Sequence, residues 1–274
     1  MDKLNRTIVV MSRNAENSLV VQSNSLIEAR YKLPLLAQQI LWVLISMIQP
    51  SCVDLKEQFY QIDVSEFGKL IGREETGNLK DEIVRAAKTL RRTPIIIRKE
   101  KGDFLETSWI QAYHYHDNAG YIDFMFSAPL KPFLIELRKR FTQYRLDSVC
   151  QLSSQYSIRL YELLRQYCDI GSRIIQMHEI RAMLGIRKEE YGDYRDFRKR
   201  VLDVAHKEIV LKTDLSYHWR PIKTGRKVTA IEFYDIVMAT PKKNREKIKD
   251  IVGNLGGKLE SPYKGMGNDY GTKR

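Results

Sequence analysis

A run of basic side chains between Tyr194 and Ile209 offers the clearest chemistry in the sequence. Apolar residues recur at helical spacing and predict an amphipathic helix over this range. The inward-facing residues are expected to be Phe197, Val201, Val204 or Ala205, and Ile209. The cations off that stripe are Arg195, Arg198, Lys199, Arg200 and Lys207. Because a helix fits the major groove, where arginine can bind guanine edges and lysine phosphates, we predict that these cations bind DNA. The alternative is a solvated helix face.

His114-Tyr115-His116 is a second candidate site. Alternation along a strand puts both imidazoles on one face, which suits a metal ion. The pattern resembles the His-hydrophobic-His element of rolling-circle nickases, which bind a metal there and attack DNA with a tyrosine. No third ligand and no nucleophilic tyrosine stands out among the 15 tyrosines. We therefore predict no metal ligand and keep the nickase as an alternative to two histidines on the solvated side of a strand.

Other catalytic signatures are missing. The sequence lacks the P-loop, the glycine fingerprint of dinucleotide-binding folds, and the H-E-x-x-H and G-x-S-x-G motifs. An ATP-driven helicase and the common hydrolases are therefore disfavoured, and we predict no enzymatic activity and no cofactor. Three widely spaced cysteines, Cys52, Cys150 and Cys168, form no C-x-x-C pair. They fit a reducing cytoplasm rather than a disulfide framework.

Composition narrows the choice of partner. The 274-residue chain carries a formal net charge of +12, which favours nucleic acid ahead of an anionic membrane surface. Hydrophobic residues make up 43% of it, enough for two packed domains. The longest apolar run, Leu33–Ile48, is interrupted by Gln38-Gln39 and is too short to span a bilayer. Leu19, Leu26, Leu33, Ile40 and Met47 are spaced by seven residues as in a coiled coil, but Pro34 interrupts that spacing and core packing is favoured. We expect a buried helix there and no membrane partner.

The elements that position these residues occur in the same order twice. The first half has expected helices at Ile40–Ile45, Val64–Gly72 and Leu79–Leu90, then strands at Ile95–Ile97, Leu105–Tyr115 and Tyr121–Phe126. The second half has expected helices at Ile158–Tyr167, Met177–Gly185 and Tyr194–Ile209, then a hairpin of Leu215–Trp219 and Val228–Val237. Three helices and a hairpin are the order of a winged helix-turn-helix. The prediction is an α+β protein with two tandem winged helix-turn-helix domains.

Capping residues and glycines mark where the expected helices begin and end. Helix caps are expected at Asp63, Asn78, Ser153 or Ser154, and Asp193, and helix stops at Gly72 and Gly185. A connecting helix is expected at Leu130–Arg140. The predicted organisation is a flexible arm at 1–19, an N-terminal domain at 20–140, a C-terminal domain at 141–240 and a basic flexible tail at 241–274.

Further cations are expected to contact DNA from outside the second-half helix. The second hairpin contributes Lys223, Arg226 and Lys227. The first-half helix contributes Lys80, Arg85, Lys88, Arg91 and Arg92, and the following turn contributes Lys101. For the first half, non-specific phosphate contact is the milder alternative.

Four separated stretches resemble the iteron-binding replication initiators of bacterial plasmids, the relatives of the F-plasmid and R6K initiators. They are Val20–Asn24, Arg140–Leu146, Leu152–Leu163 and Asp196–Leu202, and they occur in the family's order. The similarity runs from about Val20 to Val237 and leaves out the arm and the tail.

The resemblance implies two winged-helix domains that bind repeated origin sequences, called iterons. It implies that monomers start replication, while dimers repress the initiator's own promoter or pair origins. By position it places Arg198, Lys199 and Arg200 at the iteron, whereas Asp193 stands where a relative has a cation. It further implies opening of an A·T-rich region and recruitment of the host initiator and replicative helicase, without bond cleavage.

Two expectations accompany this reading. Leu33–Ile48 and the first-domain strands are the expected surfaces for self-association, because they carry more apolar residues than one helix-turn-helix needs. A plain winged-helix transcription regulator, with no role in replication, is the third functional hypothesis.

Overall fold

The computed structural model describes residues 7–12, 15–48, 58–73, 78–98, 102–116, 119–135 and 140–239. The helices of its first part are η1 (Ala15–Asn17), α1 (Asn24–Ile27), α2 (Leu35–Ser46), α3 (Val64–Leu70), α4 (Leu79–Arg92), η3 (Ala128–Leu130), α5 (Lys131–Leu134) and α6 (Leu146–Cys150). The strands of this part are β1 (Thr7–Val10), β2 (Leu19–Ser23), β3 (Gln58–Asp63), β4 (Pro94–Arg98), β5 (Phe104–Ser108), β6 (Ile110–Tyr115), β7 (Tyr121–Phe126) and β8 (Phe141–Arg145).

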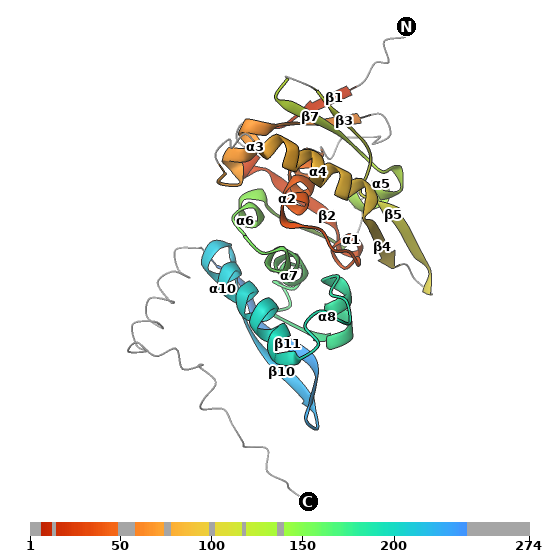
Figure 1. Cartoon of the computed structure of the whole chain (residues 1–274). Coiled ribbons are helices and arrows are strands. Elements are labelled where there is room, and N and C mark those ends of the chain that lie inside the picture. The colour runs from red at the N-terminus through yellow and green to blue at the C-terminus, as the bar shows by residue number, and fades with distance from the viewer. Residues whose placement is uncertain are drawn as a thin grey trace, which may run out of the picture.

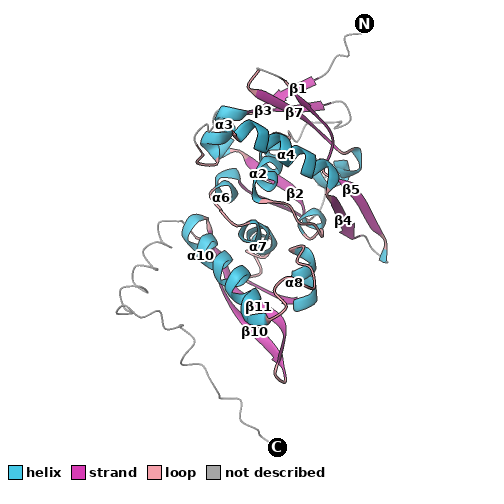
Figure 2. Cartoon of the chain, in the orientation of Figure 1, coloured by secondary structure: helices cyan, strands magenta, loops and turns pink. Residues whose placement is uncertain are grey.

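The second part begins with a central helix. Its helices are α7 (Gln155–Arg165), α8 (Met177–Met183), α9 (Tyr194–Phe197), η4 (Arg198–Leu202) and α10 (Asp203–Lys212). Its strands are β9 (Ser172–Gln176), β10 (Leu215–Thr224) and β11 (Lys227–Met238). In Figure 1, α7 lies between the first part and α10, and the β10–β11 hairpin projects away from the first part. Figure 2 shows the helices concentrated between the β1–β3–β7 strands at one end and this hairpin at the other.

The first part combines helices α2, α3 and α4 with a sheet in the order β1-β3-β7-β6. The predicted inner face of α4 is confirmed, because Leu79, Ile83, Ala86, Ala87 and Leu90 are all buried. The Asp63 carboxylate accepts a hydrogen bond from the Glu66 N–H at 2.9 Å and caps α3 as expected. A separate two-stranded sheet pairs β4 with β5.

The second part repeats the order of three helical elements and a hairpin. Ser154 caps α7 by accepting hydrogen bonds from two backbone N–H groups. The segment from α9 through η4 to α10, Tyr194–Lys212, is termed the recognition helix below. Its inner face contains Ala205, which is fully buried, while Val204 is 39% exposed. Strands β10 and β11 form the hairpin, and β9 adds a third strand beside β11.

Two strands that are far apart in the sequence pair within the first part. Strands β2 and β8 are antiparallel, with Leu19 opposite Arg145 and Ser23 opposite Phe141. This pairing crosses the domain limit expected at residue 140. The end of α8 also comes close to the first part, since a Cβ on Gly185 would lie 2.5 Å from the Tyr31 carbonyl oxygen. Gly185 has a φ of +63°, so only glycine suits both the turn and the close approach.

A buried ionic network joins the parts at α7. The Arg159 guanidinium donates to the Glu162 carboxylate at 2.8 Å, and the two side chains are 2% and 0% exposed. The other Glu162 oxygen accepts hydrogen bonds from Gln22 at 2.6 Å, Trp42 at 2.7 Å and the Tyr144 hydroxyl at 2.5 Å. Arg159 also donates to the backbone carbonyls of Ile27 and Ala29. Burial and the adjacent Glu162 carboxylate raise the pKa of Tyr144 well above its ordinary value.

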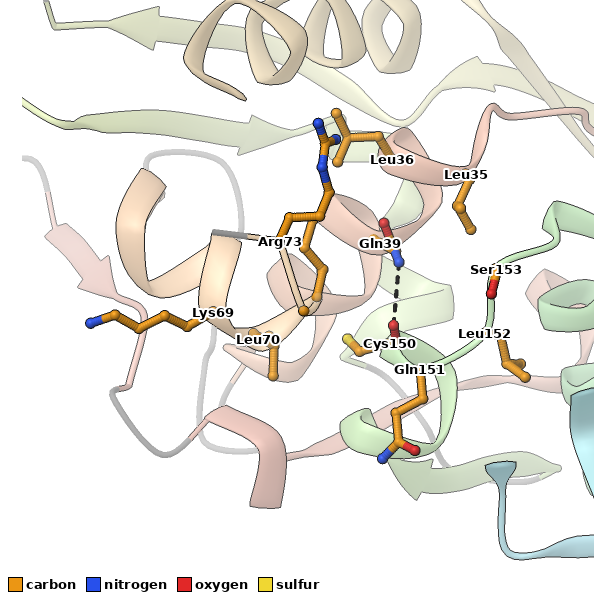
Figure 3. A pocket seen from close by; sticks show the side chains of 12 residues that line it. Leu35, Leu36, Gln39, Lys69, Leu70, Arg73, Cys150, Gln151, Leu152 and Ser153 are labelled. Atoms are coloured by element: carbon orange, nitrogen blue, oxygen red, sulfur yellow. Dashed lines mark hydrogen bonds between the residues drawn. The ribbon is translucent and has the colours of Figure 1, made fainter. Parts of the chain in front are cut away.

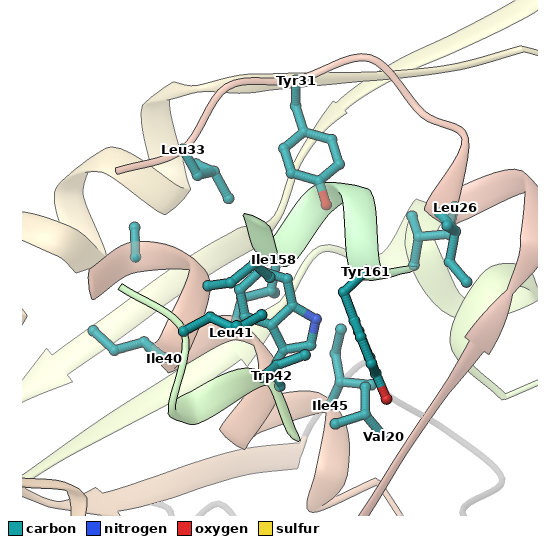
Figure 4. Packing of buried hydrophobic residues seen from close by; sticks show 14 of the residues in the cluster. Val20, Leu26, Tyr31, Leu33, Ile40, Leu41, Trp42, Ile45, Ile158 and Tyr161 are labelled. Atoms are coloured by element: carbon teal, nitrogen blue, oxygen red, sulfur yellow. The ribbon is translucent and has the colours of Figure 1, made fainter. Parts of the chain in front are cut away.

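Helix α2 is buried on all sides. Every residue from Ala37 to Ile45 is buried, and Figure 4 shows Trp42 packed among side chains from α2 and α7. This confirms core packing over a coiled coil. It contradicts the expectation that Leu33–Ile48 forms a self-association surface, because the segment's apolar side chains already fill the interior. None of the described helices is both long and apolar enough to cross a membrane.

Several local expectations differ from the structure. In place of the unstructured arm expected at 1–19, Thr7–Val10 forms β1, parallel to β3. Asn78 makes no side-chain capping hydrogen bond. The expected strand Leu105–Tyr115 is broken at Trp109, which is buried. The two pieces, β5 and β6, belong to different sheets. The expected helix Leu130–Arg140 is already complete at Leu134 in α5. The tail expected at 241–274 lies outside the described residues.

Candidate nucleic-acid interface

A pocket of about 920 Å³ lies between the start of the recognition helix, α8 with the turn that follows it, and the β10–β11 hairpin. The cations that line it are Arg181, Lys188, Arg195, Arg198, Lys223, Arg226 and Lys227. Among the described lining residues, Asp193 is the one carboxylate. Cations gathered around one concave surface attract a polyanion such as DNA. The fold thus brings the predicted helix residues Arg195 and Arg198 together with the predicted hairpin residues.

The recognition helix begins at the edge of this pocket. The Asp193 carboxylate accepts a hydrogen bond from the Arg195 N–H at 2.9 Å and caps the helix as predicted. Phe197, Val201 and Ile209 are fully buried beneath it, which turns the polar side outward. The Arg195 side chain is exposed at the first turn, where it can reach a bound duplex.

Arg198 is held by protein contacts at the pocket wall. Its guanidinium carbon lies 5.9 Å from the centre of the Trp219 ring, and its Nε lies 3.4 Å from an Asp203 carboxylate oxygen. The chain makes a π-helical turn at Arg198–Leu202, where a regular helix was expected. Such turns change the direction of side chains and occur often at functional sites. Arg198 therefore has less freedom to approach a base than its exposed neighbours Lys199 and Arg200.

Arg181 on α8 positions the turn that leads to the recognition helix. Its guanidinium donates to the carbonyls of Arg187 and Tyr191, each at 3.0 Å, and to that of Glu190. It also lies 5.7 Å from the centre of the Phe197 ring. These contacts hold the turn in one conformation and leave Lys188 exposed at the pocket. The sequence analysis omitted both Arg181 and Lys188, and the position of Lys188 between the two helices is the signal that points to it.

The hairpin supplies the opposite wall. Thr224 and Lys227 pair across a tight turn in which Gly225 has a φ of +61°, a conformation that favours glycine. Lys223, Arg226 and Lys227 are exposed at this tip. Projecting lysine and arginine side chains suit contacts with the phosphate backbone beside a groove.

Three predicted cations of the recognition helix lie outside the pocket. Lys199, Arg200 and Lys207 are exposed. Asp196 and Asp203 are exposed on the same segment, so the charge there is mixed, whereas the charged residues that line the pocket are cations apart from Asp193. Together with the pocket lining, these three cations account for all the second-domain residues predicted to bind DNA.

The first domain offers a cationic helix face. Arg85, Lys88, Arg91 and Arg92 are exposed on α4. Lys80 is half-buried, with its Nζ 4.5 Å from the centre of the Tyr115 ring. Lys101 lies outside the described residues. This face has exposed cations on one element only, unlike the pocket of the second domain.

The His114 and His116 side chains have a third potential ligand beside them. Asp123, on the neighbouring strand β7, brings one carboxylate oxygen to 2.7 Å from His116 Nε2. This third ligand is not apparent from the sequence, because Asp123 is close to the histidines only through strand pairing. The cluster lies on the β1-β3-β7-β6 sheet and adds nothing to the cationic pocket.

A second pocket, of about 600 Å³, lies where α2 and α3 face the turn between α6 and α7. Figure 3 shows its leucine side chains and the hydrogen bond from Gln39 to the Cys150 carbonyl, at 3.3 Å. Burial raises the pKa of the Cys150 thiol to about 12, so its thiolate is not populated near neutral pH. This lining is mainly apolar and lacks the cation cluster that a polyanion needs.

Two family models match the chain. The model described as "Initiator Replication protein, WH1" matches residues 19–165, and that described as "Initiator Rep protein, WH2" matches residues 176–234. These matches confirm the prediction of two tandem winged-helix domains. The first match extends through β8, α6 and α7, which the sequence analysis assigned to the second domain.

The chain is similar to two curated proteins and to a solved structure. PI protein of Escherichia coli is 29% identical over 191 residues, which cover 64% of this chain and 62%, less than two thirds, of that protein. An uncharacterized 27.6 kDa protein of Escherichia coli is 24% identical over 207 residues, covering 72% of this chain and 86% of that protein. The crystal structure of Pi initiator protein in complex with iteron DNA has the same fold, with a TM-score of 0.68. It is 22% identical and the match covers 81% of this chain and 98% of that chain.

Proposed function

Because the chain belongs to the initiator replication protein family through both its WH1 and WH2 domains, we propose that it is a plasmid replication initiator that binds iteron DNA. The pocket of seven cations between the recognition helix and the hairpin carries this proposal. A helix that presents arginines beside a cationic hairpin matches the docking of winged helix-turn-helix proteins in the major groove. The related Pi initiator protein was crystallised with iteron DNA.

The second domain reads the sequence in this proposal. Arg195, Lys199 and Arg200 are exposed along the outer side of the recognition helix and contact base edges. Lys223, Arg226 and Lys227 contact phosphates from the hairpin, with Lys207 contacting the backbone farther along the helix. Arg198 supports the helix against Trp219 and makes the remaining contact from the wall. The α4 cations of the first domain meet phosphates at a neighbouring part of the repeat.

The remaining roles concern what bound initiators do next. The protein opens an A·T-rich region, recruits the host initiator and the replicative helicase, and as a dimer represses its own promoter. The first-domain sheet is the surface proposed for self-association, since Ile8 and Val10 are 49% and 59% exposed on its edge strand β1. These steps need only binding energy and no bond cleavage.

The direct test is a footprint of the full chain on the plasmid's own origin. Protection repeated at the spacing of the iterons supports the proposal. Arg195→Ala should weaken that protection, whereas Lys69→Ala removes an equal charge from α3, outside the cationic pocket, and serves as the matched control. Equal protection of random DNA and origin DNA by the native protein contradicts the proposal.

Two assays separate the alternatives. A transcription regulator protects its promoter but leaves the A·T-rich region of a supercoiled origin unmelted in a permanganate assay. A His-Tyr-His nickase converts supercoiled origin plasmid to the relaxed form in a metal-dependent reaction that His114→Ala abolishes. Origin melting without nicking is the result that the initiator proposal requires.

A further inference from the structure

Three side chains with metal-binding atoms meet on the first-domain sheet. His114 on β6 lies directly opposite Asp123 on β7 in the strand register, and His116 follows two residues later on the same face. The ring centres of His114 and His116 are 3.9 Å apart. One potential ligand atom from each of His114, His116 and Asp123 lies within 4.8 Å of the other two.

We propose that His114, His116 and Asp123 bind one divalent transition-metal ion of the zinc class. Two imidazoles and a carboxylate are the ligands that such ions prefer, whereas magnesium and calcium favour sites built from oxygen alone. With bonds of about 2.0–2.1 Å to nitrogen, tetrahedral coordination places ligand atoms roughly 3.3 Å apart. Small side-chain rotations therefore suffice, because the present contacts range from 2.7 Å up to 4.8 Å.

The surroundings of the cluster resemble a supported metal site. Gln61, from the adjacent strand β3, donates a hydrogen bond to the other Asp123 oxygen at 2.9 Å. Because Asp123 is only 5% exposed, its carboxylate has little freedom to turn away from the histidines. The Tyr121 ring lies 4.5 Å from the His116 ring and limits its rotation. Outer contacts of this kind orient the ligands and raise metal affinity.

The exposed position of His114 leaves the fourth coordination site open to water. A bound ion joins β7 to the end of β6, the strand at the edge of the sheet. Its expected consequence is a more stable first-domain sheet, because the metal binds the folded arrangement and not the unfolded chain. The cluster lies outside the cationic pocket of the second domain, while Lys80 of α4 contacts Tyr115, which stands between the two histidines.

The test uses the untagged full-length protein after removal of metal with EDTA. Titration with Zn²⁺ in a calorimeter should give saturable binding of one ion per chain, and Co²⁺ should give the visible absorption of a bound ion. His114→Gln and His116→Gln should each lower the affinity at least roughly tenfold, and Gln61→Ala roughly 10-fold to 100-fold. His178→Gln, at an exposed histidine of α8, is the matched control and should leave binding unchanged.

Thermal unfolding gives a second readout. Zn²⁺ should raise the Tm of the native protein and of His178→Gln, but not that of His114→Gln. Because His114 is exposed, its variant should fold, and circular dichroism checks this. Absence of saturable Zn²⁺ binding by the native protein overturns the proposal, and so does equal binding by His114→Gln. In either case the cluster is a hydrogen-bonded His116–Asp123 pair without a metal.

Discussion

Charged side chains serve opposite purposes at the α7 junction and at the cationic pocket. At the junction, Arg159 and Glu162 are almost fully buried, and their polar contacts lie within the chain. Around the pocket, Arg195, Lys223 and Lys227 are exposed. A buried pair needs every partner in place to offset its desolvation, whereas exposed cations cost little until DNA arrives. The first arrangement holds α7 inside the WH1 match at residues 19–165, and the second leaves charge available for binding.

The stretches that resemble the plasmid initiators lie mostly around the buried network and not at the cationic pocket. Three of the four resembling stretches meet at Glu162, since Gln22 comes from the first, Tyr144 from the second and Glu162 itself from the third. Only the stretch Asp196–Leu202 lies in the recognition helix. Most of the resembling sequence therefore lies around the buried network that holds α7 in place, while one stretch lies in the recognition helix, whose exposed cations are proposed to read DNA.

The largest expected effect comes from breaking the junction. Glu162→Ala leaves the Arg159 charge buried without its partner and removes the acceptor of three hydrogen bonds. We expect the free energy of unfolding to fall by about 3–5 kcal/mol, measured by urea denaturation. Glu189→Ala removes an exposed carboxylate and should change it by less than about 0.5 kcal/mol. A loss below about 1 kcal/mol for Glu162→Ala means that the network is not what holds α7 in place.

The next effect concerns the exposed side of the comparison. Arg200→Ala should cost about 1–3 kcal/mol of binding to the iteron and little on random DNA, because a base contact is specific. Its stability should stay close to that of the native protein, since Arg200 is exposed. Fluorescence anisotropy at one salt concentration measures both affinities. An unchanged ratio of iteron to random affinity removes Arg200 from the base-reading set.

A smaller effect distinguishes the hairpin from the first domain. Lys227→Ala should weaken iteron and random DNA alike, and it should reduce the slope of log affinity against log salt, about −5 for six phosphates, by about 1. Lys88→Ala should lower the ratio between the two DNAs by an intermediate amount, because linked domains raise each other's effective concentration. If Lys88→Ala collapses the ratio while Arg200→Ala does not, the first domain reads the sequence.

Local signals made part of this arrangement predictable. The inner face of α4 follows from periodicity, and the caps at Asp63, Ser154 and Asp193 follow from short polar side chains before helical runs. Each signal lies within a few residues of the feature that it predicts. The predicted cap at Asn78 was wrong, because its side chain makes no capping hydrogen bond. Whether a polar residue caps a helix depends on the local backbone geometry, which the residue type alone does not give.

Contacts between distant segments were not predictable in this way. Strands β2 and β8 are short, and they pair although Leu19 and the opposite residue Arg145 are far apart in the sequence. The residues of neither strand indicate which strand it pairs with. Asp123 reaches the two histidines only across a strand pair. Lys188 joins the pocket because Arg181 holds its turn through backbone carbonyls, which no side-chain pattern records. The candidate site was therefore predicted from the cations of one helix and one hairpin. The contribution of Arg181 and of the turn that carries Lys188 was not predicted.

The smallest expected effect tests whether the junction and the pocket act independently. Lys32 follows Tyr31 in the chain, and its Nζ lies 2.5 Å from a Glu190 carboxylate oxygen in the turn beside the pocket. That hydrogen bond, with a second from the Arg187 N–H, holds the pKa of Glu190 below its ordinary value.

The Lys32 and Glu190 side chains are partly exposed, so Lys32→Ala should reduce the free energy of unfolding by only about 0–1 kcal/mol at pH 7. A carboxyl whose folded-state pKa is lowered stabilises the fold above its unfolded pKa of about 4.3, and that contribution disappears as the pH falls through the folded-state pKa. In urea denaturation the native protein and the variant should therefore differ at pH 7 and converge as the pH falls below the folded-state pKa of Glu190. Because Arg181 still holds the turn, the ratio of iteron to random affinity should not change. A fall in that ratio as large as the one caused by Arg200→Ala would show that the junction sets the geometry of the reading surface, and the separation between the two regions would not hold.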